Sequence, residues 1–280
     1  MTHAVKIVDL DGTLWNLDVC PWIILKEDPS TPILRVEKND RTLIENGSIN
    51  SDFIIDHCGR RMNLSDSLVK KIQSKAGRKV TPEKVGLSYA EWIMPEELAK
   101  QADNMFYYDG VIKDLAKKPG DTVVLTSRYN QGKHTALLMN LDRHLADYKV
   151  KVKEYHFVGN SNAYPDKESN AAKKAYVVLQ YLMGLQIDRI KKRFLQQACD
   201  SYVLVDFYDD EPLNLANVEN LQSYLNTCFY NSDQDVKRMV LERLNLTKLV
   251  VHINRATGNT LKPYEKNTIE LTFPDKKVLF

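Results

Sequence analysis

Several features that would point to particular classes of protein are missing from this sequence. It has no stretch of about 18 consecutive apolar residues, so we expect no membrane-spanning helix. Its 4 cysteines are scattered and form no Cys-x-x-Cys pair, which argues against a disulfide framework and against a zinc site. The opening residues, MTHAVKIVDLDG, lack the basic and apolar regions of a signal peptide. Together these absences favour a cytoplasmic protein.

Neither sign of charge dominates either. Lysine and arginine number 39 and aspartate and glutamate 37, for a formal net charge of +2. This balance excludes a strongly cationic nucleic-acid binder but permits an anionic substrate. With 280 residues, 43% of them hydrophobic, the chain can form one large domain or one domain with an inserted module. Its oligomeric state is left open.

Short apolar runs alternate with helical patterns over much of the chain. The runs predicted as strands are Val5–Asp9, Asp121–Thr126, Glu154–Asn160, Ser201–Tyr208 and Thr247–Asn254. The patterns predicted as helices are Asp109–Lys118, Gly132–Tyr148, Ser169–Gly184, Gln186–Cys199 and Leu213–Thr227. Nearly continuous apolar strands that alternate with helices indicate an α/β fold, with a Rossmann-like parallel sheet sandwiched by helices.

The long interval between the first two strands breaks this alternation and indicates a large insertion over residues 14–104. Within it, WIIL and PILRV predict two strands, and a meander could continue across Asn46-Gly47. Leu64–Gly77 and Met94–Phe106 have helical patterns. The predicted sheet core is therefore discontinuous, over 1–13 and 105–254. Residues 255–280, with a possible strand TIELTF, form a C-terminal extension.

Polar side chains follow the predicted strands at their carboxyl ends, where open α/β sheets bind ligands. Asp9 and Asp11 end the first strand, and Thr126, Ser127 and Arg128 end the second. The loop GNSNAYPD follows the third. The fourth strand leads into the acidic run Asp209-Asp210-Glu211. Taken alone, each of these could be an ordinary polar turn, and the argument for a site rests on their order along the chain.

Carboxylates that converge on one point repel each other, and a hard cation such as Mg²⁺ would relieve that repulsion. Asp9 and Asp11 are two residues apart, so in an extended strand both side chains point to one side. One could attack a phosphorus atom while the other moves protons. Gly12 would let the chain turn away, and Thr126 could donate a hydrogen bond to a phosphoryl oxygen. A lysine is also expected, to balance charge on the transferring group.

Three of these motifs resemble those of the haloacid dehalogenase (HAD) superfamily of phosphohydrolases. DLDGT resembles its DxDGT signature, VVLTSR its second motif and VDFYDDE its fourth. The resemblance implies a HAD core with a flap and a C1-type cap inserted at 14–104. It implies that Asp9 is the nucleophile and a Mg²⁺ ligand, and that Asp11 is the general acid/base and lends its carbonyl to the metal. Thr126 would contact the phosphoryl group, and Asp209 and Asp210 would complete the metal site.

The third motif of that family is a lysine near the start of the helix before the fourth strand. Lys173 and Lys174 both qualify, and Lys167 is a further candidate. We favour Lys173, because an N-cap at Ser169 would place it in the first turns of the helix.

A narrower resemblance concerns the substrate. LTSR followed by FYDDE is similar to the pattern of polynucleotide 3′-phosphatases and of the "Swiss army knife" RNA-repair phosphatases. Arg128 matches the arginine of that pattern, whereas Ser127 replaces a glycine and Glu211 an arginine. Gly12, Ser127 and Arg128 are the predicted substrate-binding residues. The expected partner is a phosphorylated substrate, either a nucleic-acid end or a small phosphometabolite such as a nucleotide. A catalytically silent binding or scaffold module remains the alternative. The sequence contains no P-loop motif, so we expect no kinase domain beside the phosphatase.

Other polar and aromatic residues have simpler interpretations. Asp206, within the fourth strand, could be a further ligand but is expected at an edge position or in a paired structural role. The cations of Lys75–Lys79 are expected to be solvated, and could also grip a second phosphate or a nucleic-acid backbone. Trp15, Trp22 and Trp92 are expected mainly in core packing, with base stacking as the other use of such rings.

Overall fold

The computed structural model describes residues 4–16, 22–36, 49–57, 60–88, 105–128, 135–159 and 168–274. The chain forms two compact units, one of residues 1–16 and 105–280 and the other of residues 17–104. Lys167, Trp92, the Asn46-Gly47 turn and most of the loop after Gly159 lie outside the described residues. Among the described residues, no helix has the length and apolar character needed to cross a membrane.

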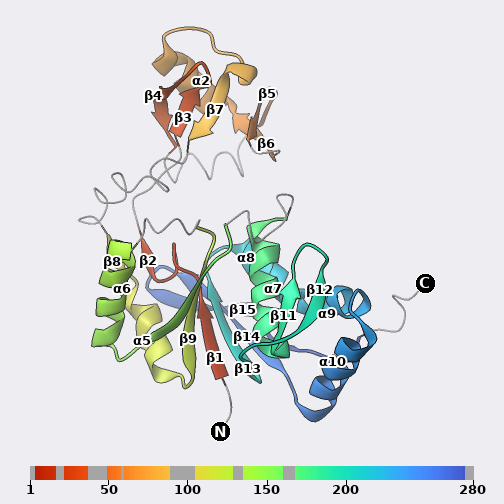
Figure 1. Cartoon of the computed structure of the whole chain (residues 1–280). Helices are drawn as coiled ribbons and strands as arrows, with labels where there is room; N and C mark the ends of the chain where they lie inside the picture. Colours follow the sequence, from red (N-terminus) through yellow and green to blue (C-terminus); the bar gives the residue numbers. More distant parts are fainter. Residues whose placement is uncertain are drawn as a thin grey trace. The chain divides into compact units, whose positions relative to one another are not determined.

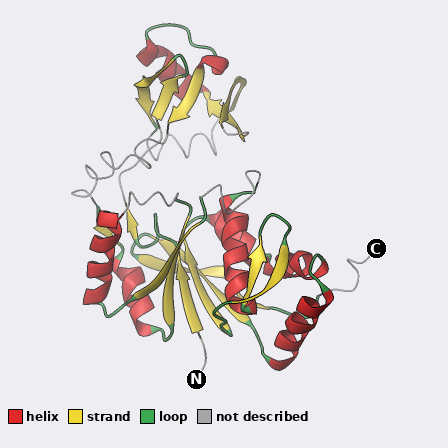
Figure 2. Ribbon diagram, in the orientation of Figure 1, coloured by secondary structure: helices red, strands yellow, loops and turns green. Residues whose placement is uncertain are grey.

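The larger unit is built on a mixed, mostly parallel six-stranded sheet with helices on both faces (Figures 1 and 2). In spatial order its strands are β10 (Val152–Phe157), β9 (Asp121–Thr126), β1 (Ala4–Val8), β13 (Leu204–Asp209), β14 (Val250–Thr257) and β15 (Thr260–Glu270). Only the pairing of β14 with β15 is antiparallel. The α/β class and the parallel core of the sheet are therefore confirmed. The strand predicted over Asp121–Thr126 has the same bounds in the structure, as β9.

The direction of strand addition reverses between β1 and β13. The chain first adds β9 and then β10 on one side of β1, and afterwards adds β13 and β14 on the other side. Ligands of open α/β sheets bind beyond the carboxyl ends of the strands at such a reversal. Val8 lies opposite Tyr208 in the register, so the residues that follow, Asp9 and Asp209, end their strands side by side.

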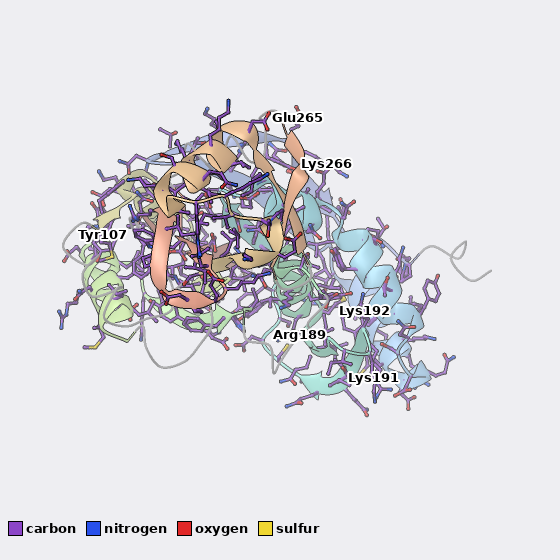
Figure 3. The ribbon with its side chains drawn as sticks, turned by 90° about the horizontal axis from the view of Figure 1, so that it is seen from above. Tyr107, Arg189, Lys191, Lys192, Glu265 and Lys266 are labelled. Carbon is purple, nitrogen blue, oxygen red and sulfur yellow. The ribbon has the colours of Figure 1, made fainter. Side chains whose placement is uncertain are left out.

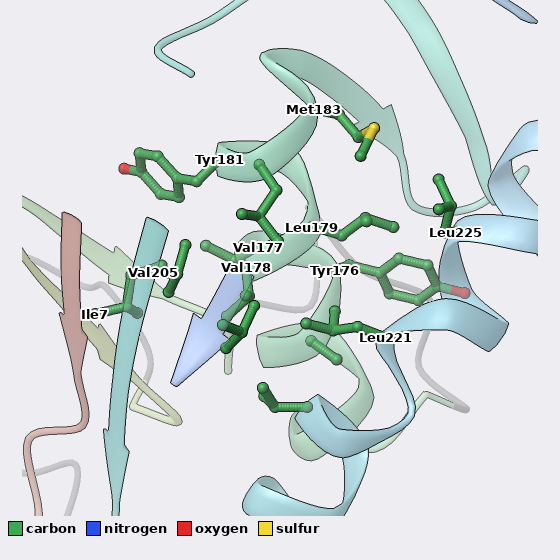
Figure 4. Packing of buried hydrophobic residues seen from close by; sticks show 14 of the residues in the cluster. Ile7, Tyr176, Val177, Val178, Leu179, Tyr181, Met183, Val205, Leu221 and Leu225 are labelled. Atoms are coloured by element: carbon green, nitrogen blue, oxygen red, sulfur yellow. The ribbon is translucent and has the colours of Figure 1, made fainter. Parts of the chain in front are cut away.

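Seven α-helices are present in the described residues. They are α2 (Asp66–Ala76), α5 (Asp109–Lys117), α6 (Thr135–Asp147), α7 (Asn170–Met183), α8 (Pro212–Glu219), α9 (Leu221–Tyr230) and α10 (Gln234–Leu246). α7 is buried along nearly its whole length, with Tyr176 and Val178 among the core residues that pack between the sheet and α9 (Figure 4). Ser169 caps it, because its Oγ accepts a hydrogen bond from the Ala172 N–H at 3.2 Å.

Two helix predictions need correction. Gln186–Cys199 is not a helix but the antiparallel hairpin of β11 (Leu185–Asp188) and β12 (Arg193–Ala198). Oδ1 of Asp188 accepts hydrogen bonds from two backbone N–H groups of the turn, those of Ile190 and Lys191, which stabilises the turn between the two strands. Leu213–Thr227, predicted as one helix, is divided at Asn220 into α8 and α9. α10 was not among the predicted helices.

The boundaries between the two units differ slightly from the predicted ones. β2 (Trp15–Asn16) pairs with β8 (Phe106–Tyr107), so residues 14–16 belong with the larger unit. The residues after Asn254 are more than an extension, because they complete β14 and form the edge strand β15.

The smaller unit has a core of its own. Its three-stranded antiparallel sheet has the order β4 (Asp28–Arg35), β3 (Trp22–Leu25) and β7 (Val85–Ser88). A separate hairpin consists of β5 (Ile49–His57) and β6 (Arg60–Ser65), and a 3-10 turn, η1 (Pro82–Lys84), precedes β7. Leu68 and Ile72 of α2 pack with Ile23 and Leu87 of the sheet. The predicted strands WIIL and PILRV and the helix within 64–77 are thus present.

Candidate functional site

Three carboxylates meet where the sheet topology reverses. Asp9 follows β1, Asp209 ends β13 and Asp210 comes next. Each offers an oxygen, and these oxygens lie within 4.8 Å of one another. The backbone N–H of Asp9 donates to the carbonyl of Tyr208 at 2.9 Å, which ties the end of β1 to β13. We call Asp9, Asp209 and Asp210, with the lysine described next, the carboxylate centre.

Lys174 is the cation of this centre. Its Nζ donates to Oδ1 of Asp9 at 2.7 Å and to Oδ2 of Asp209 at 2.8 Å. The Lys174 side chain is 1% exposed and that of Asp209 is 0% exposed, so these charges are shielded from water. The neighbouring carboxylates hold the pKa of Lys174 above its usual value, although burial alone would lower it. Lys174 is therefore a buried ammonium that bridges two strand ends.

The preference for Lys173 was therefore wrong about which lysine reaches the carboxylates. Both lysines are buried near the start of α7, but only Lys174 is seen to bind Asp9 and Asp209. Successive helical residues differ by about 100° around the helix axis, so depth below the N-cap does not determine which side chain faces the sheet. The apolar stripe offered no guidance either, because α7 is buried on almost every side.

Asp209 is oriented by Asn214, which was not among the predicted site residues. Nδ2 of Asn214 donates to both oxygens of Asp209, at 2.9 and 3.0 Å, and the Glu211 N–H donates to Oδ1 at 2.9 Å. Asn214 lies in the first turns of α8 and is buried. Glu211, which departs from the polynucleotide-phosphatase pattern, is the N-cap residue of that helix. The only signal in the sequence was the position of Asn214, five residues after the acidic strand end.

Asp210 is held against the turn that follows β1. Oδ1 of Asp210 accepts a hydrogen bond from the Thr13 hydroxyl at 3.2 Å. Gly12 has a φ of +83°, and a Cβ atom at this position would overlap the Asp210 carboxylate. The backbone conformation therefore favours glycine here, and a Cβ atom would displace the Asp210 carboxylate. Gly12 thus shapes the carboxylate centre, and its predicted contact with substrate stays a prediction.

Burial raises the pKa of two carboxyl groups in the centre. For Asp9 the raising effect of burial, to which Asp209 and Asp210 add, outweighs the opposing charge of Lys174. For Asp210, burial and the charge of Asp209 raise the pKa to about 6. A bound cation would favour the ionised forms of both groups.

Asp11 has a different environment from Asp9, two residues away. Arg128 binds its carboxylate through two hydrogen bonds, Nε to Oδ2 and Nη2 to Oδ1, both 2.7 Å long. The indole N–H of Trp15 donates to Oδ1 at 2.9 Å. Burial alone would raise the pKa of Asp11, but the Arg128 charge and these hydrogen bonds hold it below the usual value. The Asp11 side chain therefore lies outside the carboxylate centre and is held as an anion.

The other predicted residues lie at the end of β9. Thr126 is buried, and its hydroxyl accepts a hydrogen bond from the Arg128 N–H at 3.3 Å. Ser127 is half-buried in the bend between them. Thr126 thus supports the bend that carries Arg128, while contact of either residue with a phosphoryl group stays a prediction. Asp206 is paired with Lys118 at 2.9 Å, which agrees with the structural role expected for it.

The set of donors fits a hard divalent cation. Mg²⁺ prefers carboxylate and other oxygen ligands in proteins, and the carboxylate centre offers three carboxyl groups close together. Asp9 and Asp210 would be the principal ligands, because Lys174 and Asn214 already donate to both oxygens of Asp209. Asp209 would then contribute chiefly negative charge and the position of Lys174.

Comparison of the chain with models of protein families, with curated proteins and with solved structures finds no match in any of the three, so the function of the site is argued from its residues alone.

Proposed function

We propose that this protein hydrolyses phosphomonoesters at the carboxylate centre, with Asp9 as the nucleophile and Mg²⁺ as the metal ion. The observation that carries the proposal is the buried contact of Lys174 with both Asp9 and Asp209, beside Asp210, at the reversal point of a parallel sheet. A carboxylate fixed by a cation at a strand end is oriented for attack on phosphorus. The proposal includes the HAD-like core and the assignment of residues 17–104 as the cap inserted into it.

Mg²⁺, when bound, would neutralise charge on the phosphoryl oxygens and keep the carboxylates ionised. An oxygen of Asp9 attacks phosphorus, the bond from phosphorus to the ester oxygen breaks, and the alcohol leaves with a proton from Asp11. Water then attacks the phosphorus of the aspartyl-phosphate and gives a proton to Asp11. Inorganic phosphate leaves and Asp9 is restored. Lys174 holds the Asp9 carboxylate in place during both steps.

Arg128 has two roles in this proposal. It keeps Asp11 ionised, which is the form that takes the proton from water in the second step. Protonation of the leaving alcohol needs the acid form of Asp11, so Arg128 must then turn at least partly toward the phosphoryl group. A guanidinium suits that group, because its fork of N–H donors matches phosphate oxygens. Thr126 supplies the bend that allows Arg128 to face the site.

The pairing of Arg128 with Asp11 also favours a second candidate, a binding module that holds a metal and a phosphate without turnover. If Arg128 never releases Asp11, the alcohol receives no proton and hydrolysis of an alkyl ester stalls. Metal binding without phosphate release from any ester would be the signature of this alternative.

The test measures phosphate release from an aryl phosphate and from an alkyl phosphate by the full chain with Mg²⁺. We expect Asp9→Asn to abolish turnover of both esters without unfolding the protein. The control is Asp206→Asn, which changes a buried aspartate of β13 that pairs with Lys118 instead of the centre. It should keep activity on both esters. Unchanged turnover in Asp9→Asn, with circular dichroism showing a folded protein, would exclude the mechanism.

A further inference from the structure

The smaller unit carries an open groove between α2 and the sheet edge. The groove has a volume of about 710 Å³. It is lined by Trp22, Ile33, Leu34, Arg35, Lys70, Lys71, Ser74 and Lys75. Half of these side chains are cationic and none is acidic. We call this set the α2 groove, and it lies wholly within the unit of residues 17–104.

The cations of the α2 groove are grouped in a way that does not help the helix. Lys71 and Lys75 are four residues apart on α2, so they lie on one face about one turn from each other. Like charges at this spacing destabilise a helix slightly, and the only acidic residue of α2 is Asp66 in its first turn. Lys70, Lys71 and Lys75 are all exposed. A helix selected for stability alone would alternate the signs of these charges.

An aromatic ring accompanies the cations. Trp22 on β3 pairs directly with Arg35 on β4, so their side chains lie next to each other on the sheet. Trp22 is only half-buried, unlike Trp15, which is buried in the larger unit. Ile33 and Leu34, both half-buried, also line the groove. Exposed cations beside a partly exposed indole form a surface for an anion that also has flat apolar rings.

We propose that the α2 groove binds single-stranded nucleic acid, with phosphates on the lysines and Arg35 and a base against Trp22. Positive grooves with aromatic platforms bind single strands in this way, with little dependence on base identity. An acidic peptide would satisfy the charges but would not use the indole. The proposal deepens the proposed function and rests on it in one respect: a strand held here makes a nucleic-acid end, and not a small phosphometabolite, the substrate of the carboxylate centre.

The experiment measures the affinity of the full chain for a short fluorescein-labelled oligo(dT) with a free 3′-hydroxyl, by fluorescence anisotropy over a range of salt concentrations. In K70A/K71A/K75A we expect weaker binding. The slope of log affinity against log salt concentration should become shallower by about 2, since each phosphate contact on a single strand contributes about 0.7 to it. Trp22→Leu should weaken binding about fivefold or more without changing the slope.

The matched control is K26A/K79A/K84A, which removes the same charge from exposed positions of the same unit outside the α2 groove. A second control, K191A/K192A, removes two exposed lysines of the β11–β12 turn in the larger unit (Figure 3). Both should bind nearly as tightly as the unchanged chain. The proposal would be overturned if either control lost as much affinity as K70A/K71A/K75A, or if the unchanged chain did not bind the strand. It would also be overturned if polyglutamate displaced the labelled strand as well as unlabelled oligo(dT) does.

Aryl-phosphate hydrolysis separates this proposal from the proposed function. The α2 groove variants should hydrolyse the aryl phosphate at the unchanged rate, because the carboxylate centre is intact. A chain that binds the strand through the α2 groove but hydrolyses no phosphate ester would support the groove and exclude the catalytic proposal. A chain that hydrolyses the aryl phosphate but does not bind the strand would support the catalytic proposal and exclude the role of the α2 groove.

Discussion

The Lys174 ion pairs of the carboxylate centre are buried, whereas the three lysines of the α2 groove are exposed and share the groove with no acidic side chain. Lys174 contacts Asp9 and Asp209, and each of the three side chains is less than 10% exposed. Lys70, Lys71 and Lys75 of the α2 groove are in contact with solvent. Buried charges are strongly coupled because little water screens them, while exposed charges act nearly independently. Substitutions should therefore have large, non-additive effects in the centre and small, additive effects in the groove.

The largest effect should come from Lys174→Met, compared with Lys173→Met on the same helix. Loss of Lys174 leaves two buried carboxylates without their cation, which typically costs about 3–5 kcal/mol of stability. We also expect phosphatase kcat to fall by about 100-fold or more. Lys173→Met should affect kcat little. The checks are urea unfolding and aryl-phosphate kinetics, and equal losses of kcat in the two variants would contradict the geometry described for α7.

A smaller effect is expected from Gly12→Ala, compared with Gly77→Ala. Both glycines have positive φ, +83° and +64°, so alanine at either position carries a similar backbone cost of about 1–2 kcal/mol. Only at Gly12 would the new Cβ overlap Asp210, since the space around Gly77 is open. We therefore expect the affinity for Mg²⁺ to fall only in Gly12→Ala, by about tenfold, the result of a weakening of about 1.4 kcal/mol.

Calorimetric titration with Mg²⁺ measures that affinity, and unfolding measures the shared backbone cost. If both variants bound Mg²⁺ as well as the unchanged chain, Asp210 would not be a ligand whose position matters.

The pH dependence of Mg²⁺ binding gives a further test of the centre. Burial and Asp209 raise the pKa of Asp210 from the usual 3.8 to about 6. Between pH 3.8 and about 6, without a cation, the folded protein therefore holds a proton on Asp210 that the unfolded chain has lost. The contribution of this group to the free energy of unfolding declines as pH rises through this range. The proton competes with Mg²⁺, so the apparent affinity should fall by up to about tenfold for each pH unit below about 6.

Titrations at a series of pH values in buffers of different ionisation heat would show the proton release that accompanies binding. In Asp210→Asn the part of the proton release that comes from this carboxyl group should disappear, and the affinity for Mg²⁺ should be weaker at every pH. A proton release that is the same in both proteins would assign the titration to another group, with Asp9 as the next candidate.

The sequence predicted the parts of the centre that depend on strand ends. Parallel strands bring their carboxyl ends to one edge, so the apolar runs before Asp9, Thr126 and Asp209 were enough to expect these residues at the same edge. That expectation needed the order of the strands only roughly. It did not need the position of any side chain.

Contacts that depend on the rotation of a helix or on packing could not be predicted in this way. Lys174 differs from Lys173 by one helical step, and Asn214 reaches Asp209 only because α8 starts immediately after β13. The prediction of a helix in place of the β11–β12 hairpin was wrong for a related reason. Ile187, Ile190 and Phe194 have a spacing that also fits a helix, and the turn chemistry of Asp188 was the signal against it.

The smallest effects are expected from single substitutions in the α2 groove, and they test the comparison itself. Lys70→Ala and Lys75→Ala should each weaken oligo(dT) binding about two- to threefold, and the double variant should show the product of the two. Exposed charges on phosphate are screened and act nearly independently, so their free energies add. The matching double variant in the carboxylate centre combines Lys174→Met with Asp209→Asn. It should lose less free energy of unfolding than the two single variants together, because the second change removes a carboxylate that the first has left unpaired. Double-mutant cycles for the two pairs measure both couplings. A strong coupling between Lys70 and Lys75 would mean that the groove holds its ligand in one fixed arrangement, as a dedicated phosphate pocket does, and not along a strand.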